Sequence, residues 1–178
     1  GAFSGASSAL LLKRQTPSLK VLVVERTTEF SRKVGESTSE VGACFLTRVL
    51  HLGHYLNAHH YQKHGLRMWF NQKASDRVED CTELGPKFQS RLPTFQLDRS
   101  LLDQHVLDLA VSAGVELLRP ATIRDITLAE AGENHRMGLK TSTGEERTVS
   151  ARWLIDASGR KALLSKKLGL HRQLGDEH

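Results

Sequence analysis

Two neighbouring stretches of sequence decide the fold: GAFSGASSALLL at residues 1–12 and KVLVVE at residues 20–25. The first is a run of small residues leading into leucines, which is typical of a tight turn that opens a helix packed closely on a sheet. The second is a continuous β-branched run, which predicts a parallel strand buried on both faces and closed by the carboxylate of Glu25. Together they predict the last two parts of a βαβ unit.

The strand that should lead this unit would precede Gly1. We therefore expect the chain to be an incomplete copy of its domain, with the first strand and the C-terminal half missing. Without that strand, the sheet would expose an unpaired edge and apolar surface, which another part of the full protein must cover.

The remaining sequence predicts an α/β fold with a parallel sheet and an antiparallel three-stranded meander. A helix is expected at residues 41–52, capped by Ser37 or Ser39, and a second helix follows Asp98 and ends at Gly114. Single strands are expected at residues 66–70, 94–97, 115–118 and 153–156, a polar excursion or hairpin at 71–87, the meander at 122–128, 135–140 and 146–149, and a last helix at 163–168.

Composition excludes several classes of protein. The net charge of +5 comes from 25 basic residues scattered among 20 acidic ones, and only 6% of positions are aromatic, so a solvated basic surface is favoured over a nucleic-acid site. The longest apolar runs fall far short of the roughly 20 residues that cross a bilayer. We predict no membrane span and no nucleic-acid partner.

The cysteine and histidine patterns do not indicate a metal site. Cys44 and Cys81 lie far apart and have no CxxC partner, which makes a reducing cytoplasm the expected location. Five histidines cluster at residues 51–64 without an HExxH pattern, so a polar helix end and loop is favoured over metal binding.

The first turn and first strand suggest a dinucleotide site. Such a site needs a glycine-rich turn, a helix N-terminus that binds the pyrophosphate, and a carboxylate about 20 residues on that accepts from a ribose hydroxyl. Gly5 and Glu25 are 20 positions apart and fit this pattern, but Ala2 stands where a middle glycine is usual. A small-residue helix start without a ligand therefore remains the alternative.

Four further segments resemble flavin-dependent halogenases and the related geranylgeranyl-reductase-like flavoproteins. They are KVGEST at 33–38, FQLDR at 95–99, PATI at 120–123 and ARWLIDASGR at 151–160. The similarity runs over nearly the whole chain. It implies a Rossmann-like FAD-binding domain, with residues 61–97 belonging to a sheet insertion on the substrate side.

The resemblance also implies roles for individual residues. Lys63 matches the segment in which halogenases carry an essential lysine that accepts or orients hypohalous acid; a surface lysine beside a strand is the alternative. By themselves Ser37, Gln96 and Asp156 are more often caps or turn formers than ligands. The residues expected to bind FAD are Ser4, Gly5, Ala6, Glu25, Arg26, Glu36, Ser37, Gln96, Arg99, Ile123, Asp156 and Gly159.

The implied activity is that of an FAD-dependent monooxygenase or halogenase, which acts on an organic small molecule through reduced flavin and O2. A separate flavin reductase is a candidate partner. Two alternatives stay open: a flavin-dependent alkene reductase of the geranylgeranyl-reductase type, and an inactive nucleotide-binding remnant, which Ala2 and the missing ends suggest.

Overall fold

The computed structural model describes residues 1–71, 77–85, 88 and 92–172. The chain divides into two compact units. The first comprises Gly1–Ser31 and Ser100–His178, and the second comprises Arg32–Arg99. Within the described residues, every helix is too short or too polar to span a bilayer.

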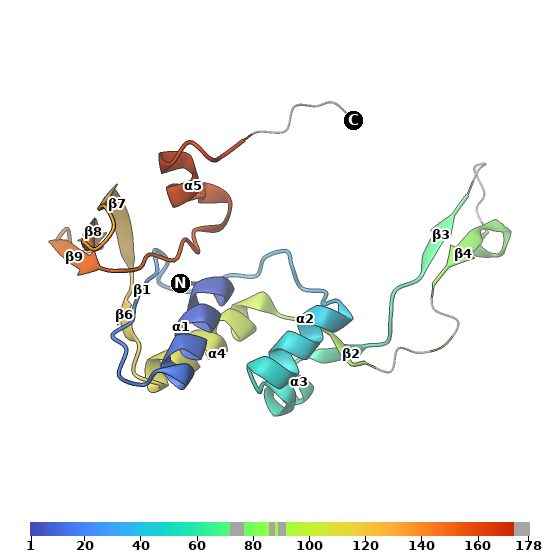
Figure 1. The fold of residues 1–178 in the computed structure, drawn as a ribbon. Helices are drawn as coiled ribbons and strands as arrows, with labels where there is room; N and C mark the ends of the chain where they lie inside the picture. The colour runs from blue at the N-terminus through green and yellow to red at the C-terminus, as the bar shows by residue number, and fades with distance from the viewer. Residues whose placement is uncertain (72–76, 86–87, 89–91, 173–178) are drawn as a thin grey trace. The chain divides into compact units, whose positions relative to one another are not determined.

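A helix and a parallel strand pair form the base of the first unit (Figure 1). Helix α1 (Phe3–Gln15) leads into β1 (Leu22–Val24), which pairs in parallel with β6 (Glu116–Leu118). The helix preceding β6 is α4 (Arg99–Ser112), whose Val106, Leu107 and Ala110 are fully buried. The predicted order of helix and parallel strand is confirmed, and so is the α/β class.

The predicted meander is also confirmed. It consists of β7 (Ala121–Thr127), β8 (His135–Thr141) and β9 (Glu146–Ala151), paired antiparallel in the order β7-β8-β9. After it come a 3-10 turn, η3 (Gly159–Lys161), and the short helix α5 (Leu163–Lys167).

The prediction of a buried strand at residues 153–156 is wrong for this structure. The segment lies outside the named strands, and Trp153 and Ile155 are 84% and 61% exposed. No described strand pairs with this segment. Its apolar side chains are therefore left in solvent, because a parallel strand needs a partner strand to become buried.

The second unit begins with helices where one helix was predicted. Its first helix is α2 (Glu40–Cys44), which continues as the π-helical turn η1 (Phe45–Val49), and α3 (Gly53–His59) follows. Ser39 is the cap, since its side chain accepts a hydrogen bond from the backbone N–H of Gly42 at 3.3 Å. The break is consistent with His51, which has a φ of 59° that no continuous helix tolerates.

Two antiparallel pairs complete the second unit. The pair β2 (Tyr61–Lys63) and β5 (Thr94–Gln96) contains the buried Phe95. The other pair, β3 (Met68–Phe70) and β4 (Thr82–Leu84), accounts for the predicted strand at 66–70 and part of the predicted hairpin, with the 3-10 turn η2 (Val78–Asp80) ahead of β4. Of that hairpin, residues 72–76 and 86–87 lie outside the described residues. Strand β2 was missed because Tyr-Gln-Lys lacks the β-branched signal.

Candidate functional site

The start of α1 lies directly against Glu25 in the first unit. The backbone nitrogen of Gly1 is 3.2 Å from Glu25 Oε2, and a Cβ added at Gly1 would lie 2.6 Å from Glu25 Cβ. No side chain caps this helix end, and its first turn has no acidic residue, which suits an anion. The turn and the carboxylate, the two predicted parts of a dinucleotide site, therefore lie side by side.

Thr27 holds the Glu25 carboxylate. Its backbone N–H and its hydroxyl donate to Glu25 Oε1 at 2.9 and 2.8 Å. Glu25 is 7% exposed, and burial opposes its charge, but the hydrogen bonds that the carboxylate accepts, above all those from Thr27, lower the pKa of Glu25 below its ordinary value of 4.5. Sequence reasoning missed Thr27; a hydroxyl two residues after a strand-end acid is the signal that could have found it.

Close backbone packing supports the other side of α1. A Cβ added at Gly5 would lie 3.3 Å from Ala157 Cβ, so a larger side chain would push α1 away from the loop after residue 156. Both Asp156 oxygens accept backbone N–H bonds, from Ser158 at 2.9 Å and Leu164 at 2.8 Å. Burial disfavours the charged carboxylate, but the hydrogen bonds that it accepts outweigh burial and lower the pKa of Asp156 below its ordinary value of 3.8. Asp156 thus shapes the loop that contains Gly159.

In the second unit, the GEST segment pairs with the FQLDR segment. Ser37 forms a β-bridge with Gln96, and the Leu97 N–H donates to the Glu36 carbonyl at 2.6 Å. The Thr38 hydroxyl accepts from Phe95 N–H at 2.8 Å. Two predicted segments about 60 residues apart are thereby brought together.

Lys63 joins the same cluster. Its ammonium donates to Ser37 Oγ and to the Thr38 carbonyl, the latter at 2.8 Å. The described residues supply no third acceptor, so one N–H of this half-buried lysine is available to a ligand. The same edge includes Arg99, whose Nη1 donates to the Gly35 carbonyl at 3.4 Å and would lie 2.8 Å from a Cβ at Gly35.

The other predicted residues contribute less clearly. Arg26 is exposed on the loop after Glu25, and Ser4 is exposed on the first turn of α1. Ala6 is fully buried in α1. Ile123 is half-buried on β7; it is Ala121 instead whose N–H reaches the Glu25 carbonyl, at 2.8 Å.

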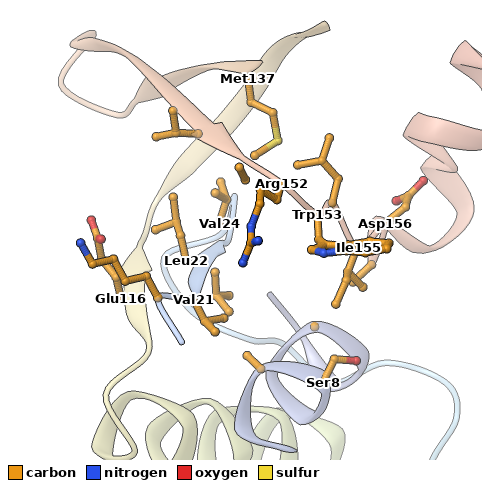
Figure 2. A pocket seen from close by; sticks show the side chains of 18 of the residues that line it. Ser8, Val21, Leu22, Val24, Glu116, Met137, Arg152, Trp153, Ile155 and Asp156 are labelled. Atoms are coloured by element: carbon orange, nitrogen blue, oxygen red, sulfur yellow. The ribbon is translucent and has the colours of Figure 1, made fainter. Parts of the chain in front are cut away.

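A cavity of about 1380 Å³ lies in the first unit and is lined by α1, β1, the meander and residues 152–158. Figure 2 shows Val21, Leu22 and Val24 on one side and Trp153 and Ile155 on the other. Its walls are mainly apolar. The cavity lies where the sequence predicted an unpaired sheet edge, while the strand expected ahead of Gly1 stays a prediction.

The residues present fit FAD. At Gly1 the backbone lies so close to Glu25 that an added Cβ would collide with it, and this places the start of α1 beside the carboxylate that a ribose hydroxyl would contact. At Gly35 the φ of 97° and the neighbouring Arg99 likewise leave no room for a side chain. The helix start, the strand-end carboxylate and the Arg99 guanidinium are groups that bind the pyrophosphate and ribose of a dinucleotide.

Comparison with known proteins agrees with this chemistry. A family model described as FAD binding domain matches residues 1–178. Among curated relatives, the flavin-dependent halogenase chlA of Dictyostelium discoideum is 25% identical over 90% of this chain, and armH5 of Armillaria mellea is 27% identical over 94%. The chain spans only 30% and 32% of those two proteins.

Solved structures show the same fold. The flavin-dependent brominase Bmp2 is 27% identical, with a TM-score of 0.69 over 93% of this chain and 38% of its own. The halogenase PltM, solved with phloroglucinol and FAD, has a TM-score of 0.75 over 96% of this chain and 35% of its own, at 21% identity.

Proposed function

The chain belongs to the FAD binding domain family, and from this premise we propose that it is the FAD-binding part of a flavin-dependent halogenase. The observation that supports this most directly is the cluster of Lys63, Ser37 and Thr38, because it places a lysine beside the segment that resembles the halogenase motif. Monooxygenation without halogen is the closely related reaction, which keeps the same cofactor.

The cofactor, when bound, would supply the reaction of reduced flavin with O2. The protein's own residues bind and orient it. We assign the ribose hydroxyl to Glu25, the pyrophosphate to the uncapped start of α1 at Ser4 and Gly5, and the flavin side to the edge formed by Ser37, Gln96 and Arg99. Ala6, also expected to contact the cofactor, is fully buried and its N–H donates to the Ala2 carbonyl at 3.0 Å, so its proposed role is to close this first turn. Arg26, Glu36, Ile123, Asp156 and Gly159 remain proposed cofactor contacts.

Lys63 is the proposed catalytic residue. Two of its N–H groups hold the ammonium against Ser37 and Thr38, which fixes the direction of the third. A cation held in this way can donate a hydrogen bond to hypohalous acid and orient it toward an organic substrate. We propose that Ser37 is a positioning residue for Lys63.

The test is Lys63→Met in the full-length protein, supplied with FADH2, O2, bromide and a phenol as probe. We expect brominated phenol to fall at least a hundredfold, as for loss of a group that acts only in the chemical step, while FAD affinity and O2 consumption stay unchanged. Lys167→Met, at an exposed lysine of α5, is the matched control. Unchanged bromination in Lys63→Met would refute this role, and loss of FAD would indicate a structural one.

Two observations distinguish a halogenase from an alkene reductase and from an inactive nucleotide-binding remnant. An alkene reductase would turn over without O2, whereas a halogenase would not. A remnant would purify colourless and take up no FAD. We propose an organic small molecule as the substrate, a separate flavin reductase as a source of FADH2, a cytoplasmic location, and a substrate-side role for residues 61–97.

A further inference from the structure

The ends of the two parallel strands bear opposite charges in the first unit. Val24 and Leu118 are register partners, and the next residues along the chain are Glu25 and Arg119. Carboxyl ends of neighbouring parallel strands are where ligands bind in open α/β sheets. The role of Glu25 was predicted from sequence, whereas Arg119 was not singled out.

Arg119 is connected to Glu25 through one residue, Thr27. Arg119 Nε donates to the Thr27 carbonyl at 2.7 Å. The N–H and hydroxyl of the same Thr27 donate to Glu25 Oε1. Thr27 is therefore held on both sides, and moving its carbonyl would move the two donors that orient the carboxylate.

The guanidinium is itself held from two further directions. Arg119 Nη1 donates to Gln104 Oε1 at 2.8 Å, and the Gln104 amide is oriented by donating to Asp108 Oδ1 at 2.7 Å. The guanidinium carbon lies 4.2 Å from the centroid of the Phe30 ring, a cation–π contact. A continuous chain of hydrogen bonds thus runs from α4 to Glu25.

Stability alone does not explain this arrangement. Arg119 Nη2 is buried and has no hydrogen-bond partner among the described residues. Burying a donor of a charged group without an acceptor is destabilising, so such a group calls for a functional reason. Only the planar fork of arginine can donate along two directions and stack on a ring at the same time.

We propose that Arg119 is a positioning residue that orients Glu25, through Thr27, toward the ribose hydroxyls of an adenosine nucleotide. The inference rests on the proposed nucleotide site. It makes Arg119 a residue that determines how strongly this site prefers ribose over deoxyribose. We do not expect Arg119 to contact the nucleotide directly, because its Nη2 is buried.

The test compares binding of ADP and 2′-deoxy-ADP to the full-length protein freed of FAD, by isothermal titration calorimetry. In the wild type, we expect ADP to bind at least about tenfold more tightly than 2′-deoxy-ADP, because only ADP can donate the 2′-hydroxyl hydrogen bond to the charged Glu25 carboxylate. Arg119→Gln should reduce this ratio to about threefold or less and Glu25→Gln to about one. In the double variant, Arg119→Gln should then have no further effect, because the two residues act in series.

A ligand-free measurement separates this inference from the nucleotide site. Hydrogen exchange of the Thr27 amide should become at least about tenfold faster in Arg119→Gln, and the Glu25 pKa should move up toward 4.5. Arg124→Gln, at an exposed arginine on β7, should change neither. If the wild type binds neither nucleotide, the proposed site fails, and the exchange rate alone then decides the role of Arg119.

Arg119→Lys and Gln104→Met provide milder perturbations should Arg119→Gln fail to fold. Lysine keeps the charge but not the fork, so we expect it to recover less than half of the lost ADP preference. Gln104→Met removes the acceptor at the α4 end and should also speed Thr27 exchange. Wild-type nucleotide ratios and wild-type Thr27 exchange in folded Arg119 variants would overturn the proposal.

Discussion

The two candidate sites of the molecule, Glu25 in the first unit and Lys63 in the second, are built in different ways. Glu25 lies at the end of a parallel strand, and its partner Thr27 is two residues away. Lys63 lies on a short antiparallel strand, and its partners Ser37 and Thr38 are 26 and 25 residues away. The donors to the Glu25 carboxylate are thus local in the chain, with distant Arg119 as their support, whereas both acceptors of the Lys63 ammonium come from a distant segment.

This difference predicts how each site responds to change. The two hydrogen bonds from Thr27 to the Glu25 carboxylate should weaken but persist when the sheet edge is loosened, because Thr27 is only two residues away and Arg119 supports it from a distance. The lysine site should be lost when the pairing of residues 35–38 with 94–97 is weakened, even when Lys63 is intact. The following changes test this contrast.

The largest effect should come from filling the cavity beside β1. In an isolated piece of the protein that is cut to begin at Gly1, six residues of a Val- and Ile-rich strand fused ahead of Gly1 should raise the free energy of unfolding by about 3 kcal/mol, since each buried residue contributes about 2 kcal/mol against about 1.5 for its ordering. Urea denaturation measures this change. A Gly- and Ser-rich extension of equal length is the control, and equal stability of the two forms would refute the assignment of the cavity.

The next effect concerns the ribose carboxylate. Glu25→Gln should weaken FAD binding by roughly 1.5 to 3 kcal/mol, the contribution of a hydrogen bond to a charged group. Fluorescence titration of the full-length protein with FAD measures it. Glu29→Gln, at an exposed acid on the same loop, should leave FAD affinity unchanged. Equal affinity in the two variants would remove Glu25 from the site.

A smaller effect is expected at the pairing that builds the lysine site. Thr38→Val leaves the N–H of Phe95 without its side-chain acceptor in a place where Phe95 is 1% exposed, which should cost about 1 to 2 kcal/mol. Thermal unfolding measures it. Thr122→Val, which removes one weak 3.4 Å bond on the exposed meander, should cost less than about 0.5 kcal/mol. Similar costs in both would show that the hydrogen bond between Phe95 and Thr38 does not stabilise the pairing of these segments.

The smallest effect is a pH dependence confined to the first unit. The folded chain lowers the pKa of Glu25 below 4.5 and that of Asp156 below 3.8, so each carboxylate contributes its full stability above these ordinary values. That contribution is lost as the pH falls through the lowered pKa values. Urea midpoints from pH 5 to pH 2.5 should therefore fall less steeply in Glu25→Gln and Asp156→Asn than in the wild type.

Several parts of the fold were predictable because they depend on short-range patterns. The α1–β1 order, the helix after Asp98 and the meander follow from residue periodicity and turn residues. The helical break near His51 and the strand at residues 61–63 did not: His51 adopts a left-handed φ of 59°, and residues 61–63 lack β-branched side chains and form a strand only by pairing with residues 94–96. The predicted strand at residues 153–156 failed because burial requires a neighbouring strand.

By itself the sequence determined the chemistry: a small-residue turn, an acid 20 positions after Gly5, and the segments that resemble halogenases. Only the tertiary structure decided which residues meet. The pairing of Ser37 with Gln96 brings Lys63 to its acceptors, and Arg119 reaches Thr27 across the parallel strands. The chemical groups of a site can be read from the sequence one residue at a time, whereas a hydrogen bond between distant residues forms only when folding brings them together.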